Sequence, residues 1–200
     1  MDFEALKNEL AGRGFNHLTD AQRGVDINDA RQRIDHMYLW PYRETSVTGI
    51  APLYVDDLGT IEAVTNETGD YALMPTDYRT LLDSGDTAAV GAPQMFYVGS
   101  GNIVATYPTD TSASIGVQYW KITSDLTSDA DEPLAPARFH MLIVDMAAQR
   151  AYMRTDNYGA AQALQPFIDQ QLGAMVETLL GGQQIAGPQG WTSVTQACDG

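Results

Sequence analysis

The stretch Trp40-Pro41-Tyr42-Arg43-Glu44-Thr45-Ser46-Val47 divides the chain into two kinds of sequence. Before it, apolar side chains recur every three or four residues, which is the spacing of one helix face. After it, short runs of β-branched and aromatic residues alternate with turn-forming residues, as they do in strands. A helix is expected to end at Trp40, because the residue before a proline is disfavoured in helical backbone angles. The stretch therefore predicts a change from helix to strand near residue 43.

Two helices are predicted upstream of this stretch. In the first, apolar residues recur at helical spacing from Phe3 to Leu10, and Gly12 and Gly14 are expected to end it. The second begins with Thr19-Asp20-Ala21-Gln22, which is the pattern of a capping box. In such a box the threonine hydroxyl accepts from the backbone and the glutamine side chain reaches back. The pair predicts an α-hairpin of antiparallel helices.

Residues 43–125 predict an antiparallel β-rich module. Its clearest hairpin is residues 94–107, where Gly99-Ser100-Gly101-Asn102 supplies the turn. Residues 113–122 predict another strand, with alternate apolar side chains on one face. The glycines expected to break the shorter strands upstream are Gly49, Gly59 and Gly69.

Helices are predicted again in residues 126–182. Pro133 and Pro136 suit the start of the third helix, because the first turn does not need their missing N–H groups. Thr155-Asp156-Asn157 predicts a break and an N-cap for the fourth helix, and Pro166 is expected to kink or divide that helix. The apolar faces are Phe139, Leu142, Ile143, Met146 and Ala147 in the third helix, and Ile168, Leu172, Met175, Val176 and Leu179 in the fourth.

Together these segments predict an α+β fold in four parts. Residues 1–42 and 126–182 form an antiparallel helical bundle of two N-terminal and two C-terminal helices, and the β-rich module 43–125 is inserted between them. Residues 183–200 form an extended C-terminal arm. Because the arm is rich in glycine and glutamine, it cannot bury a core, and we expect it to order only on a partner. The predicted contact residues of the arm are Ile185, Trp191 and Val194.

Charge is concentrated in the middle of the chain. The formal net charge is -15, and residues 43–132 hold three basic and fourteen acidic side chains, a net charge of -11. Such a surface repels phosphate and argues against sequence-independent DNA binding, although solubility alone explains the charge equally well. The sequence predicts neither a signal peptide nor a membrane span. The single cysteine, Cys198, excludes a disulfide within the chain and fits assembly in a reducing cytoplasm.

No cluster of reactive side chains is predicted. The acidic run from Asp125 to Glu132 lacks the glycine and the final glutamate of an EF-hand loop, which favours a solvated linker over a calcium loop. Asp56 and Asp57 would point to opposite faces of a strand and would not converge as a catalytic pair. The histidines, which lie on separate predicted elements, are His17, His36 and His140. A three-histidine metal site assembled by the fold stays open, but the sequence predicts no enzyme, no cofactor and no metal centre.

The order of several short motifs carries a family resemblance over about residues 1–180. The motifs are Trp40-Pro41, Gly91-Ala92-Pro93-Gln94-Met95-Phe96-Tyr97-Val98, Tyr107-Pro108, Val117-Gln118-Tyr119-Trp120-Lys121, Glu132-Pro133-Leu134-Ala135-Pro136-Ala137-Arg138-Phe139-His140 and Ala151-Tyr152. In this order they resemble the head-to-tail adaptor, or connector, proteins of tailed bacteriophages. The resemblance implies a twelve-copy ring in the neck of the virion, beneath the portal, through which DNA passes without sequence-specific binding. The implied partners are the portal, copies of the chain and a stopper or tail-completion protein, with Ile185, Trp191 and Val194 as contacts to the portal or a neighbouring subunit.

Two other functions are open. The chain could be a different neck or tail-completion protein, such as a stopper, which would contact the tail rather than the portal. It could also be a carbohydrate-binding module, because aromatic side chains can form a platform for stacking sugars, although sheet core and cross-strand pairs explain them more simply. The aromatic residues in question are Phe96, Tyr97, Tyr107, Tyr119 and Trp120.

Overall fold

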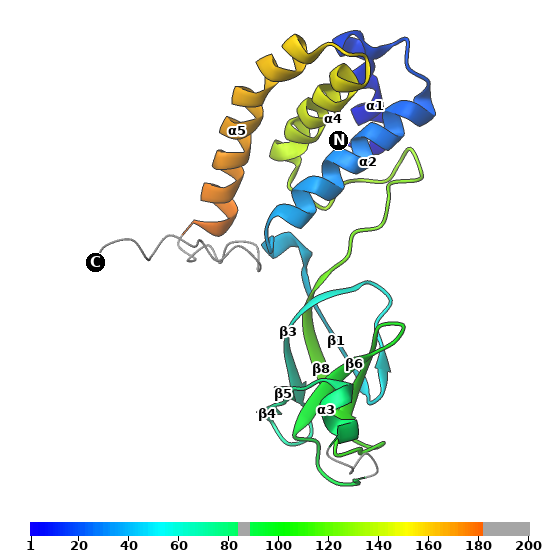
Figure 1. Cartoon of the computed structure of the whole chain (residues 1–200), viewed down its shortest axis with the longest axis vertical. Coiled ribbons are helices and arrows are strands. Elements are labelled where there is room, and N and C mark those ends of the chain that lie inside the picture. Colours follow the sequence, from blue (N-terminus) through cyan, green and yellow to red (C-terminus); the bar gives the residue numbers. More distant parts are fainter. Residues whose placement is uncertain (84–88, 182–200) are drawn as a thin grey trace, which may run out of the picture. The chain divides into compact units, whose positions relative to one another are not determined.

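The computed structural model describes residues 1–83 and 89–181 of the chain (Figure 1). The fold is α+β, and within the described residues it has five α-helices and two four-stranded sheets. The chain forms two compact units. One contains residues 1–42 and 124–181 and is called the helical unit below; the other, Arg43–Thr123, is called the β unit.

The helical unit contains four of the α-helices, and in it α4 packs against both α2 and α5 (Figure 1). A π-helical turn, Ala11–Phe15, extends the first helix beyond the glycines that were expected to end it, and Gly14 in this turn has a φ of 100°. Short 3-10 turns cover Pro41–Arg43 and Ala137–Phe139. The α-helices are α1 (Phe3–Leu10), α2 (Asp20–Met37), α4 (His140–Arg154) and α5 (Tyr158–Leu180).

The start of α2 confirms the predicted capping box. The Thr19 hydroxyl accepts from the backbone N–H of Gln22 at 3.2 Å, and the Gln22 side chain accepts from the backbone N–H of Thr19 at 2.9 Å. At its other end, α2 stops at Met37, three residues before Trp40-Pro41. The Trp40 ring is completely buried, and its Nε1 donates to the carbonyl of Ile34 at 2.6 Å. The change from helix to strand is therefore anchored in the helical core.

One hydrophobic core joins the helices of this unit. It includes every residue of the predicted third-helix face, and Ile168 and Met175 of the fourth. The other three predicted residues of α5, Leu172, Val176 and Leu179, pack against it while partly exposed. Asn157 caps α5 as predicted, by accepting from the backbone N–H of Ala160. Of the two outcomes expected at Pro166, a kink or a division of the helix, the division is absent, because α5 is continuous from Tyr158 to Leu180. The packed apolar face of α5 stabilises the helix where Pro166 lacks one backbone hydrogen bond.

The β unit has two sheets, in the strand orders β1-β8-β3-β4 and β2-β7-β6-β5. All pairs are antiparallel except β5 with β6, which is parallel. The short helix α3 (Tyr78–Asp83) follows β5. The strands are β1 (Glu44–Ile50), β2 (Leu53–Tyr54), β3 (Leu58–Asn66), β4 (Tyr71–Ala72), β5 (Met74–Pro75), β6 (Met95–Gly99), β7 (Ile103–Tyr107) and β8 (Ser114–Lys121).

Two of the four passages of the chain from one sheet to the other are short corners. Only Ala51 and Pro52 separate β1 from β2, and only Leu73 separates β4 from β5. The two sheets enclose a second hydrophobic core. Its most deeply buried side chains are Val64, Val104, Ile115 and Val117. The alternation predicted for β8 is therefore confirmed, because its apolar positions face this core.

The predicted hairpin is also confirmed, as β6 and β7, with Gly101 and Asn102 at positive φ in the turn. The expected strand breaks at Gly49 and Gly59 are wrong, since β1 and β3 run through them. At Gly59 a Cβ atom would lie only 2.3 Å from the carbonyl oxygen of Trp120. The glycine therefore permits a close approach of β3 to β8 rather than ending the strand.

Candidate interaction surfaces

Ion pairs around a buried aspartate join α2 to α4. Asp26 on α2 is fully buried, and its carboxylate accepts from Arg154 at 2.5 Å and lies 3.4 Å from Arg150. Burial raises the pKa of Asp26, and the two guanidinium groups partly offset this effect. Arg150 also pairs with Asp29. These charges are used within the helical unit, so they are not available for a partner.

A second group of polar contacts joins three further elements. The Asp145 carboxylate on α4 accepts from Arg13 of the π-helical turn and from Gln171 of α5. Lys7 on α1 pairs with Asp20 at the start of α2 and with Asp129, both at 2.6 Å. These hydrogen bonds raise the pKa of Lys7. The ionised side chains near the helix ends thus have a structural role.

The acidic run folds onto its own chain. Asp131 accepts from the backbone N–H groups of Thr127 and Ser128 at 2.8 Å, which lowers its pKa. Asp125 accepts from Gln32 at 2.6 Å. In residues 1–83 and 89–181, no group of three or more histidine, cysteine, aspartate or glutamate side chains is placed to hold a metal ion. The acidic run therefore belongs to the packing of the helical unit.

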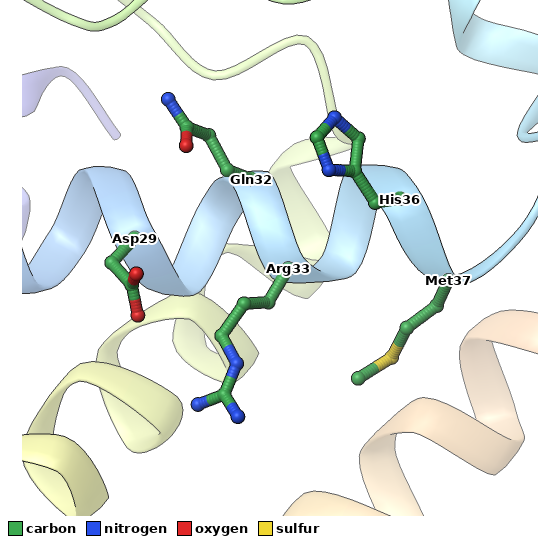
Figure 2. Close-up of a pocket in the computed structure, with 5 residues that line it drawn as sticks. All are labelled: Asp29, Gln32, Arg33, His36 and Met37. Carbon is green, nitrogen blue, oxygen red and sulfur yellow. The ribbon is translucent and has the colours of Figure 1, made fainter.

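The outer face of α2 carries a shallow, open concavity of about 440 Å³ (Figure 2). It is lined by Asp29, Gln32, Arg33, His36 and Met37. Arg33 and His36 are exposed. Within the part of the chain that the structure describes, Arg33 makes neither an ion pair nor a cation–π contact. The concavity thus offers an unneutralised cation beside the thioether of Met37.

The outer face of α5 has the opposite character. The helix contains only two charged residues, Asp169 and Glu177, and no basic one. Phe167 is 60 % exposed near its middle. Exposed residues at helical spacing along this face are Ala163, Phe167, Gln170, Ala174 and Glu177. Sequence reasoning considered only the core stripe of α5 and missed this face, although the lack of charge opposite the stripe is visible in the sequence.

The β unit carries a smaller concavity of about 270 Å³, with Tyr97 and Ile103 in its lining. Tyr97 lies against Tyr78 of α3, with ring centroids 5.3 Å apart. Phe96 and Tyr119, however, belong to the core between the sheets. Burial and a hydrogen bond to Asp57 raise the pKa of Tyr119 to about 12. The aromatic residues of the β unit therefore do not form one exposed platform, which removes the main support for carbohydrate binding.

The predicted contact residues Ile185, Trp191 and Val194, and also Cys198, lie outside the described residues. Among the helices that the structure describes, none combines the length and the apolar character needed to cross a bilayer.

Comparison with known families identifies the class of protein. The family model of the SU10 adaptor protein matches residues 1–192, which is nearly the whole chain. The chain therefore belongs to this family of phage head-to-tail adaptors, as the motif order had indicated. It is a structural phage protein and a virion component. A search of curated proteins found no match.

Proposed function

We propose that this chain is the head-to-tail adaptor of a tailed phage and forms a ring beneath the portal. The ring joins the capsid to the tail and lets DNA pass. Membership of the adaptor family over residues 1–192 is the observation that carries this proposal. The proposed partners are the portal, further copies of the chain in a twelve-copy ring, and a stopper or tail-completion protein on the tail side. The proposed site of assembly is the host cytoplasm.

Each part of the chain has a role in this proposal. Residues 1–42 and 126–182 form an antiparallel helical bundle that builds the ring. Residues 183–200 act as an arm that binds the portal or a neighbouring subunit through Ile185, Trp191 and Val194. The acidic middle of the chain, with a net charge of -11 over residues 43–132, supports passage of DNA without binding, because like charges repel phosphate.

Electron microscopy of purified portal mixed with this protein tests the ring. We expect an added layer of density on the portal in the mixture and no such layer on the portal alone. The protein without portal is expected to be a monomer by analytical ultracentrifugation. Portals that stay bare at saturating protein would overturn the proposal.

Removal of residues 183–200 tests the role of the arm. The shortened protein should bind the portal at least tenfold more weakly, if the three apolar residues act as a buried anchor of about 1.4 kcal/mol or more. Its helix content by circular dichroism should match that of the full chain. A large loss of helix would show instead that these residues belong to the core.

A further inference from the structure

Two copies of an acidic chain can pack closely only where their contact faces are nearly uncharged or carry opposite charges. Like charges brought together across an interface weaken association, and the centres of interfaces are depleted of charge. The outer face of α5 meets the first condition, because Glu177 is its one charged residue among the five exposed positions described above. Within the described residues, the Glu177 carboxylate makes no ion pair.

The outer face of α2 supplies the complementary features. Arg33 is the unpaired cation of its concavity (Figure 2), and Val25, two helical turns earlier on the same face, is 57 % exposed. At 1.5 Å per residue, Val25 and Arg33 are about 12 Å apart along α2, and Phe167 and Glu177 are about 15 Å apart along α5. Each helix thus presents an apolar and a charged side chain at similar spacing, in the same order along the chain. The other charged residue of the α2 concavity, Asp29, is already paired with Arg150.

We propose that the outer face of α5 in one copy packs on the outer face of α2 in a second copy. Glu177 then lies opposite Arg33, and Phe167 lies opposite Val25, with the two helices parallel. The two faces differ, so the contact between subunits is heterologous. Such a contact can repeat from copy to copy, as a ring requires. This contact rests on the proposed ring and names the surfaces that form it.

Gly173 gives the contact a test that separates folding from assembly. It lies on the exposed side of α5, has no other atom within 4 Å of the position of a Cβ, and has no positive φ. A side chain is therefore tolerated within one copy, and it should stabilise the helix, because glycine is a poor helix former. In a ring, a large side chain at this position would hold the neighbouring helix away.

The principal experiment reverses the charges of Glu177 and Arg33 and measures ring formation on the portal. The variants Glu177→Arg and Arg33→Glu are each mixed with portal at limiting concentration, and the fraction of portals with an added layer is counted by electron microscopy. Each single change should lower ring formation about tenfold, because it places like charges together, and the double variant should recover to within about threefold of the native protein. The matched control is Asp169→Arg, which makes the same charge change at an exposed position of α5 that is not one of the five outer-face residues, and it should form rings normally.

Gly173→Leu should raise the melting temperature and still fail to form rings. If Asp169→Arg and Glu177→Arg lower ring formation equally, if the double variant does not recover, or if Gly173→Leu assembles normally, the α2–α5 contact is wrong while the ring stands. If the native protein forms no ring on the portal, the proposed function itself fails.

Discussion

His140 ties the first residue of the chain to the start of α4. Its ring is 2 % exposed, and its Nδ1 accepts from the Met1 ammonium at 2.8 Å. Since an ammonium group only donates, the imidazole proton is on Nε2, which donates to the carbonyl of Ala135 at 2.8 Å. Burial is the main reason why the pKa of His140 is lowered. The neutral ring is thus the form that the folded protein holds.

Acid should therefore weaken the fold through His140. Below a pH of about 6.5 the unfolded chain takes up a proton on this histidine that the folded chain does not, so the free energy of unfolding falls as the pH falls. In His140→Gln this part of the decrease should disappear. At pH 7.5 the free energy of unfolding of the variant should be about 1 kcal/mol lower than that of the native protein, because the hydrogen bonds of the side chain are altered. Urea unfolding between pH 7.5 and pH 5 measures both effects.

Equal pH slopes for native protein and His140→Gln would contradict the assignment of a neutral, buried His140.

Single residues also show why the contacts of this fold were hard to foresee. Asp26 and Arg154 are 128 positions apart, and each lies on a helix that local spacing does predict. Which acidic side chain meets which arginine depends on how α2 and α4 pack, and helical periodicity carries no information about that. The ion pairs of the helical unit were therefore absent from the predictions, whereas the Thr19 capping box, made within four residues, was predicted correctly.

At the scale of elements, α5 depends on its buried face. Met175 is completely buried in the helical core, and Thr178, one turn later, is exposed. Met175→Ala should lower the free energy of unfolding by about 3 kcal/mol through lost burial and the cavity that remains. Thr178→Ala should change it by less than about 0.5 kcal/mol. Chemical denaturation of the two variants measures the difference, and similar values would show that α5 is not held by this core.

The strands show where prediction from sequence reached its limit. The β6–β7 hairpin and the alternation in β8 follow from local turn chemistry and spacing, and both are present. The strand orders of the two sheets, the parallel β5–β6 pair and the corners at Ala51-Pro52 and Leu73 arise from long-range pairing, which spacing does not specify. Glycine at position 59 was misread because it serves a close approach between strands distant in the sequence. The arm residues Ile185, Trp191 and Val194 stay predictions.

At the scale of the whole molecule, the two hydrophobic cores share no residue. The helical core draws on residues up to Trp40 and from Leu126 onward, and the core of the β unit lies between Ala51 and Tyr119. Both ends of the β unit lie in one strand pair, since Glu44 is opposite Trp120 and Arg43 donates to the carbonyl of Lys121 at 2.9 Å. The chain therefore enters and leaves this unit beside one strand pair, whose partners Glu44 and Trp120 are about 5 Å apart.

The helical unit should consequently fold without the β unit. Replacing residues 43–123 by a linker of about four glycine and serine residues should leave cooperative thermal unfolding, because the ends to be joined are close and the helical core is complete. Helix content is measured by circular dichroism at 222 nm, with the full chain as the reference. A non-cooperative transition would show that the two cores depend on each other. So would a helix content below that of α1, α2, α4 and α5 in the full chain.

The neighbouring ends of the β unit have a consequence for how such genes can change. A recombination event that exchanges the coding segment between Tyr42 and Ser124 needs only an incoming module whose own first and last strands are partners. The helical core would stay unchanged, and the new module would change which partners the middle of the chain contacts. Such an exchange would leave the coding sequence of both flanking helical segments unchanged.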